Sequence, residues 1–231
     1  MKRFWRGAAI VPILAGSLLS IANPAWASCN PGRTDDGIYY YDGDEWAPSG
    51  PGLNGVQSNI WNYNPYTAVG ANALDFVMLQ LSNNWAQIGR RTEHSSGEFT
   101  FYQWTTSPGN WLNINVAAQP VSTFTNYKVD LGSGGNFNFY VDGTKIDGKT
   151  ASFTPIQFVV EGEIHSLATQ MPGAAQNTES NWAQKYREND ANDTWYDVTS
   201  YNTINSRPTS FANVPLGSSN FDIYDKACTG S

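Results

Sequence analysis

Short runs of alternating apolar and polar residues recur along the chain, and no long segment carries the 3.6-residue apolar period of a helix. Gly, Asn, Asp, Ser and Pro separate these runs, as they commonly do between strands. The clearest runs are Val56–Tyr63, Leu74–Leu81, Trp85–Arg91, Phe99–Trp104, Trp111–Val116, Tyr127–Leu131, Phe137–Val141, Lys145-Ile146, Ile156–Ile164 and Phe221–Tyr224. About ten short strands rich in aromatic and β-branched residues predict an all-β, two-sheet antiparallel β-sandwich of the jelly-roll or concanavalin-like kind.

Turn residues refine this picture. Asp142-Gly143 and Asp147-Gly148 are turn signals that frame a hairpin, because Asp-Gly suits the positive φ angles of a type I′ turn. Residues 28–52 are rich in Gly and Pro, with Tyr39-Tyr40-Tyr41 as their strongest cluster, and we expect an N-terminal arm. Residues 174–194 are polar and predict a long loop, with one short strand at residues 183–187.

The N-terminus has the layout of a secretory signal peptide. Three basic residues precede the apolar stretch Ala8–Ile21, and Ala25-Trp26-Ala27 then supplies a signal-peptidase site. The apolar stretch is short for a membrane span. We therefore expect residues 1–27 to be removed, leaving one secreted, extracellular domain, residues 28–231, with no membrane attachment.

The charge balance changes which partners are plausible. The signal segment holds three of the 13 basic residues and none of the 20 acidic ones, so the mature chain has 10 basic and 20 acidic residues and a net charge of −10. Such a surface repels a phosphate backbone, and we expect no nucleic-acid partner. Charged residues are only 14% of the chain, and amides and hydroxyls replace them, which fits a secreted monomer that works in acid.

The two cysteines lie at opposite ends of the mature chain. Cys29 is its second residue, and Cys228 lies three residues from the C-terminus. In an oxidising compartment we expect them to form a disulfide bond. Closing so long a loop stabilises the fold by about 5 kcal/mol in the chain-entropy model.

Metal and cofactor motifs are missing from the sequence. His94 and His165 are its only histidines, and neither HxxxH nor CxxC spacing occurs. The acidic segment Asp42-Gly43-Asp44-Glu45 could hold Ca²⁺, but we expect a solvated turn there. A Ser-His-Asp triad stays open, although no G-x-S-x-G motif is present. We expect neither a metal nor a cofactor.

Two carboxylates interrupt a strand that otherwise resembles a core strand, Ile156–Ile164. Residues two apart share a face, so Glu161 and Glu163 point one way while Val160 and Ile164 point the other. The acidic face either lines a wet concave surface or is an ordinary solvated outer face.

A second polar position lies in the run Trp85–Arg91. Gln87 shares its face with Trp85, and Ile88 takes the other face. An amide beside Trp is ordinary in a half-exposed sheet, so a functional interpretation needs a partner residue.

Motifs around these positions resemble those of glutamic peptidases. Gly162-Glu163-Ile164-His165, followed by Thr169-Gln170-Met171-Pro172-Gly173, resembles the C-terminal signature of neprosin-type enzymes. Ala86-Gln87-Ile88-Gly89 falls where that family carries its first catalytic Glu. A Gln in a Leu-Gln-Thr-Gly motif is instead typical of the eqolisins, which use a Gln-Glu dyad on a similar β-sandwich. The resemblance spans roughly residues 53–190.

This resemblance implies a secreted, acid-active endopeptidase for peptide or protein substrates. Glu163 would be the base that activates water, and Gln87 would donate a hydrogen bond to the oxyanion. Trp85 and Gln170 would contact substrate. We expect Gln87 and Glu163 to share one water, Glu163 to stay ionised in acid, and Glu161 to matter less. The alternative is a non-catalytic secreted module that binds polysaccharide, since aromatic rings and amides also bind sugars.

Overall fold

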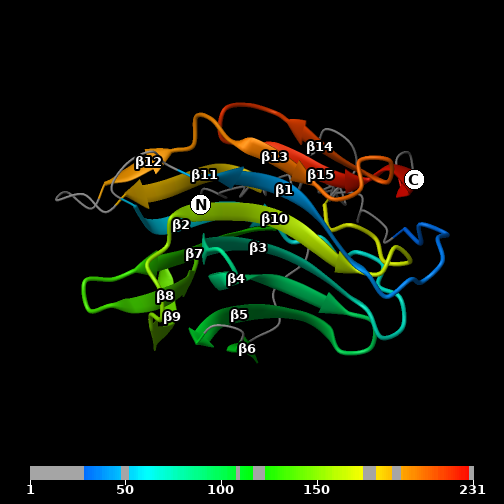
Figure 1. Cartoon of the computed structure of the whole chain (residues 1–231). Helices are drawn as coiled ribbons and strands as arrows, with labels where there is room; N and C mark the ends of the chain where they lie inside the picture. Colours follow the sequence, from blue (N-terminus) through cyan, green and yellow to red (C-terminus); the bar gives the residue numbers. More distant parts are fainter. Residues whose placement is uncertain are drawn as a thin grey trace, which may run out of the picture.

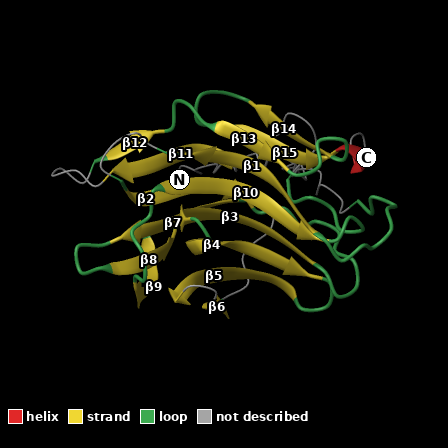
Figure 2. Cartoon of the chain, viewed as in Figure 1, coloured by secondary structure: helices red, strands yellow, loops and turns green. Residues whose placement is uncertain are grey.

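The structure, a computed structural model, describes residues 29–47, 52–107, 110–116, 123–173, 181–188 and 194–228. These residues form strands and one 3₁₀ turn, Lys226–Cys228. The strands build two antiparallel sheets that pack face to face (Figures 1 and 2). The predicted β-sandwich is therefore confirmed. The predicted signal peptide lies outside the described residues.

One sheet has seven strands in the order β13-β1-β10-β3-β4-β5-β6, and Figure 1 shows β1, β10, β3, β4 and β5 side by side. Its strands are β1 (Tyr39–Trp46), β3 (Asn72–Leu81), β4 (Asn84–Glu93), β5 (Gly97–Ser107), β6 (Asn110–Asn115), β10 (Gln157–His165) and β13 (Asn202–Asn205). We call it the seven-stranded sheet.

The other sheet has eight strands, in the order β14-β15-β11-β2-β7-β8-β9, with β12 paired to β11. Its strands are β2 (Leu53–Trp61), β7 (Phe124–Leu131), β8 (Asn136–Val141), β9 (Thr144–Thr150), β11 (Asn181–Glu188), β12 (Trp195–Asp197), β14 (Phe211–Pro215) and β15 (Phe221–Asp225). Side chains from the facing sides of both sheets make the main core, including Val77, Ile88 and Val160 from the seven-stranded sheet and Val56 and Phe139 from the other. These side chains are buried because each strand turns alternate residues inward.

Strand β1 corrects the expectation of an irregular arm and of a solvated acidic turn. It is an interior strand between β13 and β10. Asp42 and Asp44 are fully buried and point toward the other sheet, whereas Tyr39 and Tyr41 are exposed on the outer face. The sequence pattern misled because simple alternation places polar side chains outward and aromatic ones inward. In β1 the aspartates point inward, and two of the tyrosines point outward.

The predicted hairpin turn is confirmed at Asp142-Gly143. Both residues have positive φ, 47° and 77°, and they join β8 to β9 as a two-residue type I′ loop. Asp147-Gly148 is different, because it lies within β9 and pairs with β8 rather than making a turn. A register shift in that ladder, between Phe139 and Tyr140, accommodates it.

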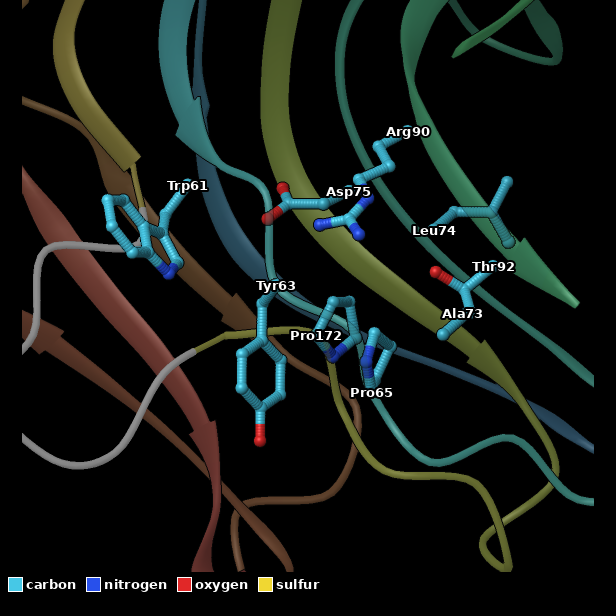
Figure 3. Close-up of a pocket in the computed structure, with 9 residues that line it drawn as sticks. All are labelled: Trp61, Tyr63, Pro65, Ala73, Leu74, Asp75, Arg90, Thr92 and Pro172. Atoms are coloured by element: carbon cyan, nitrogen blue, oxygen red, sulfur yellow. The ribbon is translucent and has the colours of Figure 1, made fainter. Parts of the chain in front are cut away.

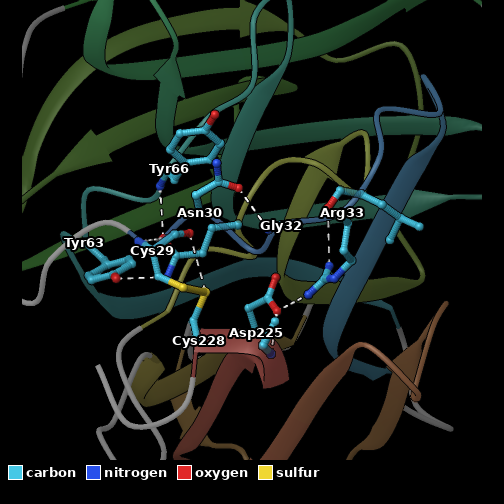
Figure 4. Close-up of a disulfide and its surroundings, with 11 residues drawn as sticks. Cys29, Asn30, Gly32, Arg33, Tyr63, Tyr66, Asp225 and Cys228 are labelled. Carbon is cyan, nitrogen blue, oxygen red and sulfur yellow. Dashed lines mark hydrogen bonds and ion pairs between the residues drawn. A yellow bond between two sulfur atoms is a disulfide. The ribbon is translucent and has the colours of Figure 1, made fainter.

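The predicted disulfide is confirmed between Cys29 and Cys228, whose Cα atoms are 5.7 Å apart (Figure 4). Beside it, Arg33 forms an ion pair with the buried Asp225. The bond and this ion pair attach the segment before β1 to the end of β15. The two ends of the described chain are therefore held together by covalent and ionic contacts.

Candidate active site

The outer face of the seven-stranded sheet, which faces away from the other sheet, carries a second apolar layer. Leu74, Phe76 and Met78 of β3, Val159 of β10 and Phe101 of β5 form a cluster there, each at most 8% exposed. Strand alternation places them opposite the inner side chains of the same strands. An outer face that was merely solvated would carry polar side chains instead.

This apolar layer is the floor of a pocket of about 450 Å³, which we call the outer pocket. That volume lies within the range of ligand sites in proteins. Its lining residues are Tyr39, Asn72, Leu74, Phe76, Met78, Gln80, Trp85, Gln87, Arg91, Gln103, Asn113, Glu161 and Glu163. Three residues that the sequence singled out, Trp85, Gln87 and Glu163, therefore line one pocket, together with Glu161.

Two glycines keep the middle of the outer pocket open. Gly43 of β1 pairs with Glu161, and Gly89 of β4 pairs with Phe76. A Cβ at Gly43 would come within 2.4 Å of the Glu161 Cβ, and one at Gly89 within 2.5 Å of the Phe76 Cβ. Neither position accepts a side chain without a shift of the neighbouring strand. The pocket is therefore not narrowed by a side chain at either position.

The amide of Gln87 is oriented by its neighbours. The Trp85 indole Nε1 donates to Gln103 Oε1 at 3.0 Å, and Gln87 Nε2 donates to the same oxygen at 2.7 Å. Because an indole N–H can only donate, it fixes which end of Gln103 is the oxygen. That oxygen in turn fixes the NH₂ end of Gln87, whose second N–H remains for a ligand.

The two glutamates lie at different distances from Gln87. Glu161 pairs with Phe76, which pairs with Gly89, whereas Glu163 lies one pleat further along β10. With about 4.8 Å between strands and about 3.4 Å per residue, the Gln87 Cα lies roughly 12 Å from that of Glu161 and roughly 17 Å from that of Glu163. The shared face of Gln87 and Glu163 is confirmed. A single water held directly between them fits this register poorly, and Glu161 is the nearer carboxyl.

Both carboxyl groups are removed from solvent. Glu161 is 7% exposed and Glu163 is half-buried, and neither has a hydrogen-bond partner among the described residues. Burial raises the pKa of Glu163 to about 7, against which the Arg91 guanidinium acts. Burial and then the charge of Glu163 raise the pKa of Glu161 well above its ordinary value. This raised pKa runs against the expectation that Glu163 stays ionised in acid, because that expectation ignored burial.

Gln170 lies away from the outer pocket, beside the disulfide. Its Oε1 accepts from the backbone N–H groups of Cys29 and Tyr66, both at 3.0 Å, and its Nε2 donates to the Tyr63 hydroxyl at 2.9 Å. The side chain is 3% exposed. The structure thus separates Gln170 from the other candidate residues and shows it fastening the segment that follows Cys29.

A second, much smaller cavity lies between the sheets (Figure 3). Its volume is about 10 Å³, which is room for one water and no larger ligand. The side chains that line it include Asp75, Arg90, Tyr63 and Trp61. Asp75 and Arg90 pair across β3 and β4 on the inner face. The outer pocket, by contrast, has room for a peptide or sugar.

Gln103, Arg91 and Asn113 line the outer pocket but were not predicted from the sequence. Gln103 had a usable signal, since it is an amide at an alternating position in the aromatic run Phe99–Trp104. Its pairing with Gln87, however, follows only from the register of β4 with β5. Arg91 had no signal beyond its position on the face of Gln87.

Comparison with solved structures supports a fold-level relation to glutamic peptidases. A scytalido-glutamic peptidase bound to a peptide-based transition-state analogue matches with a TM-score of 0.56 and 9% identity, over 83% of this chain and 100% of that one. SCP-B, a member of the eqolisin family in complex with the tripeptide Ala-Ile-His, matches with a TM-score of 0.54 and 8% identity, over the same shares. At such identities the likeness shows the fold alone.

Comparison by sequence adds nothing to this relation. No protein-family model matches the chain, and no curated protein matches its sequence. The resemblance to neprosin-type enzymes therefore stays a prediction.

In the part of the chain that the structure describes, none of the helical segments has the length and apolar character needed to cross a membrane.

Proposed function

We propose that the protein is a secreted endopeptidase whose reaction takes place in the outer pocket. The observation that carries this proposal is the convergence of the Gln87 amide and the two β10 carboxyl groups, Glu161 and Glu163, on one pocket with an apolar floor. The fold shared with two glutamic peptidases supports it. The confirmed disulfide fits an exported protein, because disulfides persist in oxidising compartments.

The chemistry needs a donor to the oxyanion and a carboxyl group that moves protons. Water attacks the peptide carbonyl, and the free N–H of Gln87 donates to the oxygen on which charge develops. A β10 carboxyl exchanges protons with the attacking water and the leaving amine as the C–N bond breaks. Trp85 and the apolar floor offer a surface on which substrate side chains can lie.

Hydrolysis of an unfolded protein, such as reduced casein, by the purified mature chain between pH 3 and pH 9 tests this proposal. Gln87→Ala should lower kcat/KM by about 10²- to 10³-fold, as loss of an oxyanion donor does. Replacing Glu161 and Glu163 together by Gln should abolish turnover. Asn202→Ala is the control, because Asn202 is an exposed amide of β13 in the same sheet and outside the pocket lining, and it should keep full activity.

The competing function is binding of a polysaccharide without hydrolysis. Saturable binding of a glucan that survives the double glutamate replacement, with no peptide cleaved at any pH, would overturn the peptidase proposal. Cleavage that persists in the double variant would equally remove the pocket from the reaction.

A further inference from the structure

Glu161 has the environment of a carboxylic acid rather than of a carboxylate. Its side chain is 7% exposed, and among the described residues it has neither a hydrogen-bond donor nor an ion-pair partner. Its neighbours on the outer face are Gly43 on one side and Phe76 on the other. An ionised carboxylate in such a place lacks the donors that would offset its lost hydration.

The charges around Glu161 are mostly of its own sign. Glu163 follows on the same face, two residues or roughly 7 Å along the strand. Glu45 and Asp42 of β1 and Asp75 of β3 also act on Glu161 and disfavour its ionised form. Arg91 of β4 is the opposing cation, but it lies on the row of Glu163 and acts on Glu163.

We propose that Glu161 is the proton donor of the outer pocket, a carboxylic acid that touches the substrate, and that Glu163 is a positioning residue whose negative charge, once Glu163 ionises as pH rises, keeps the proton on Glu161. This assignment rests on the proposed peptidase function. It reverses the expectation from sequence that Glu163 acts on water and that Glu161 matters less.

The geometry gives the two glutamates these separate roles. Glu161 lies two strands across and two residues along from Gln87, closer than Glu163, so a carbonyl oxygen held by the Gln87 amide brings its peptide nitrogen toward Glu161. Glu163 lies one pleat beyond, next to Arg91, and reaches the substrate less directly. Carboxylic acids kept neutral by apolar surroundings serve as donors in other enzymes.

Glu161 gives one proton and takes one proton back in each round of hydrolysis. Water attacks the carbonyl carbon and forms the C–O bond, while the oxygen charge is held by the N–H of Gln87. Glu161 gives its proton to the amide nitrogen as the C–N bond breaks, and the carboxylate left on Glu161 takes the proton that the attacking water loses. Glu161 is again a carboxylic acid at the end, and one water has been consumed.

This division of roles predicts different pH profiles for two variants. Activity needs protonated Glu161, so kcat/KM of the native protein should hold at low pH and fall as pH rises through the Glu161 pKa. Glu163→Gln should keep activity within about tenfold at pH 4, since Gln resembles a protonated Glu. Its profile should fall at a pH at least one unit lower, because the neighbouring charge is gone. Glu161→Gln should be inactive at every pH, with an unchanged melting curve.

Carboxyl-carbon NMR of the two glutamates supplies a readout that does not need activity. In the native protein Glu161 should titrate at a higher pH than Glu163, and Glu163→Gln should move the Glu161 midpoint to lower pH. An unmoved Glu161 midpoint, or an inactive Glu163→Gln beside an active Glu161→Gln, overturns the proposal. A native protein without peptidase activity but with the expected titration shift would remove the proposed function and keep the protonated Glu161.

Discussion

Two pairs of acids lie on opposite faces of two neighbouring strands. Asp42 and Asp44 of β1 point inward, between the sheets, while Glu161 and Glu163 of β10 point outward, into the outer pocket. They interleave in the register, since Gly43, between the two aspartates, pairs with Glu161. Burial raises the pKa of Asp42 to about 8 and that of Asp44 to about 7, as it raises the pKa of both glutamates.

The difference between the pairs lies in their partners. Asn205 Nδ2 donates to Asp42 at 2.8 Å, and Asn213 Nδ2 donates to Asp44 at 3.1 Å. The glutamates have no such donors among the described residues and border a cavity that can admit a ligand. A raised pKa therefore does not distinguish an active site from a structural acid, whereas an unpartnered carboxyl beside a pocket does.

The largest expected effect is the contribution of the inner aspartates to the pH dependence of stability. The folded protein holds the Asp42 and Asp44 protons more tightly than the unfolded chain does. This stabilisation is therefore full below the ordinary pKa of 3.8 and is lost as pH rises through 7 and 8. Each pKa unit corresponds to about 1.4 kcal/mol. The free energy of unfolding, from urea titrations, should fall markedly between pH 4 and pH 8.

Asp42→Asn should flatten that fall while peptidase activity at pH 4 stays within about threefold of native. Asp197→Asn, at an exposed aspartate paired with Lys185, is the control and should leave the slope unchanged. If Asp42→Asn abolished activity at an unchanged melting temperature, the division between structural and catalytic acids would be wrong.

A substitution at Gly43 should disturb both pairs at once. A Cβ there would come within 2.3 Å of the Val160 carbonyl oxygen and 2.4 Å of the Glu161 Cβ, so β1 and β10 must separate. Gly43→Ala should lower the free energy of unfolding by about 1–3 kcal/mol, as overpacking does, and should lower kcat/KM because Glu161 moves. Gly217→Ala, where the nearest heavy atom is 3.9 Å from the added Cβ, should be silent in both measurements. A stable, fully active Gly43→Ala would show that the interleaving has no consequence.

The sequence was sufficient for the sandwich, the disulfide and the faces of the two polar strands. Alternation in β4 and β10 placed Gln87 and Glu163 on the outer face, because the strand period of two is set by backbone geometry alone. The type I′ turn at Asp142-Gly143 followed from the φ angles that those residues tolerate.

What the sequence could not give depends on register and burial. The greater proximity of Glu161 to Gln87 comes from how β10, β3 and β4 align, and no local pattern encodes a cross-strand alignment. The buried face of β1 was missed because Asp42 and Asp44 are stabilised by amides from distant segments, Asn205 and Asn213. Gln170 matched a motif, yet its neighbours belong to the disulfide region.

The smallest expected effect concerns the amides that orient each pair. Gln103 holds the Gln87 amide through one oxygen, much as Asn213 holds Asp44 and the Gly43 carbonyl. Gln103→Met removes the acceptor at similar size and should lower kcat about tenfold, the worth of one hydrogen bond near 1.4 kcal/mol, with little change in KM or melting temperature. Gln103→Glu keeps an acceptor for Gln87 and Trp85 and should restore most of that loss. Asn213→Ala should do the opposite, lowering the melting temperature and sparing kcat. Equal losses of activity in Gln103→Met and Gln103→Glu would mean that Gln103 fills space rather than orients Gln87, and the outer pocket would then lack the rigid donor that separates it from the inner acids.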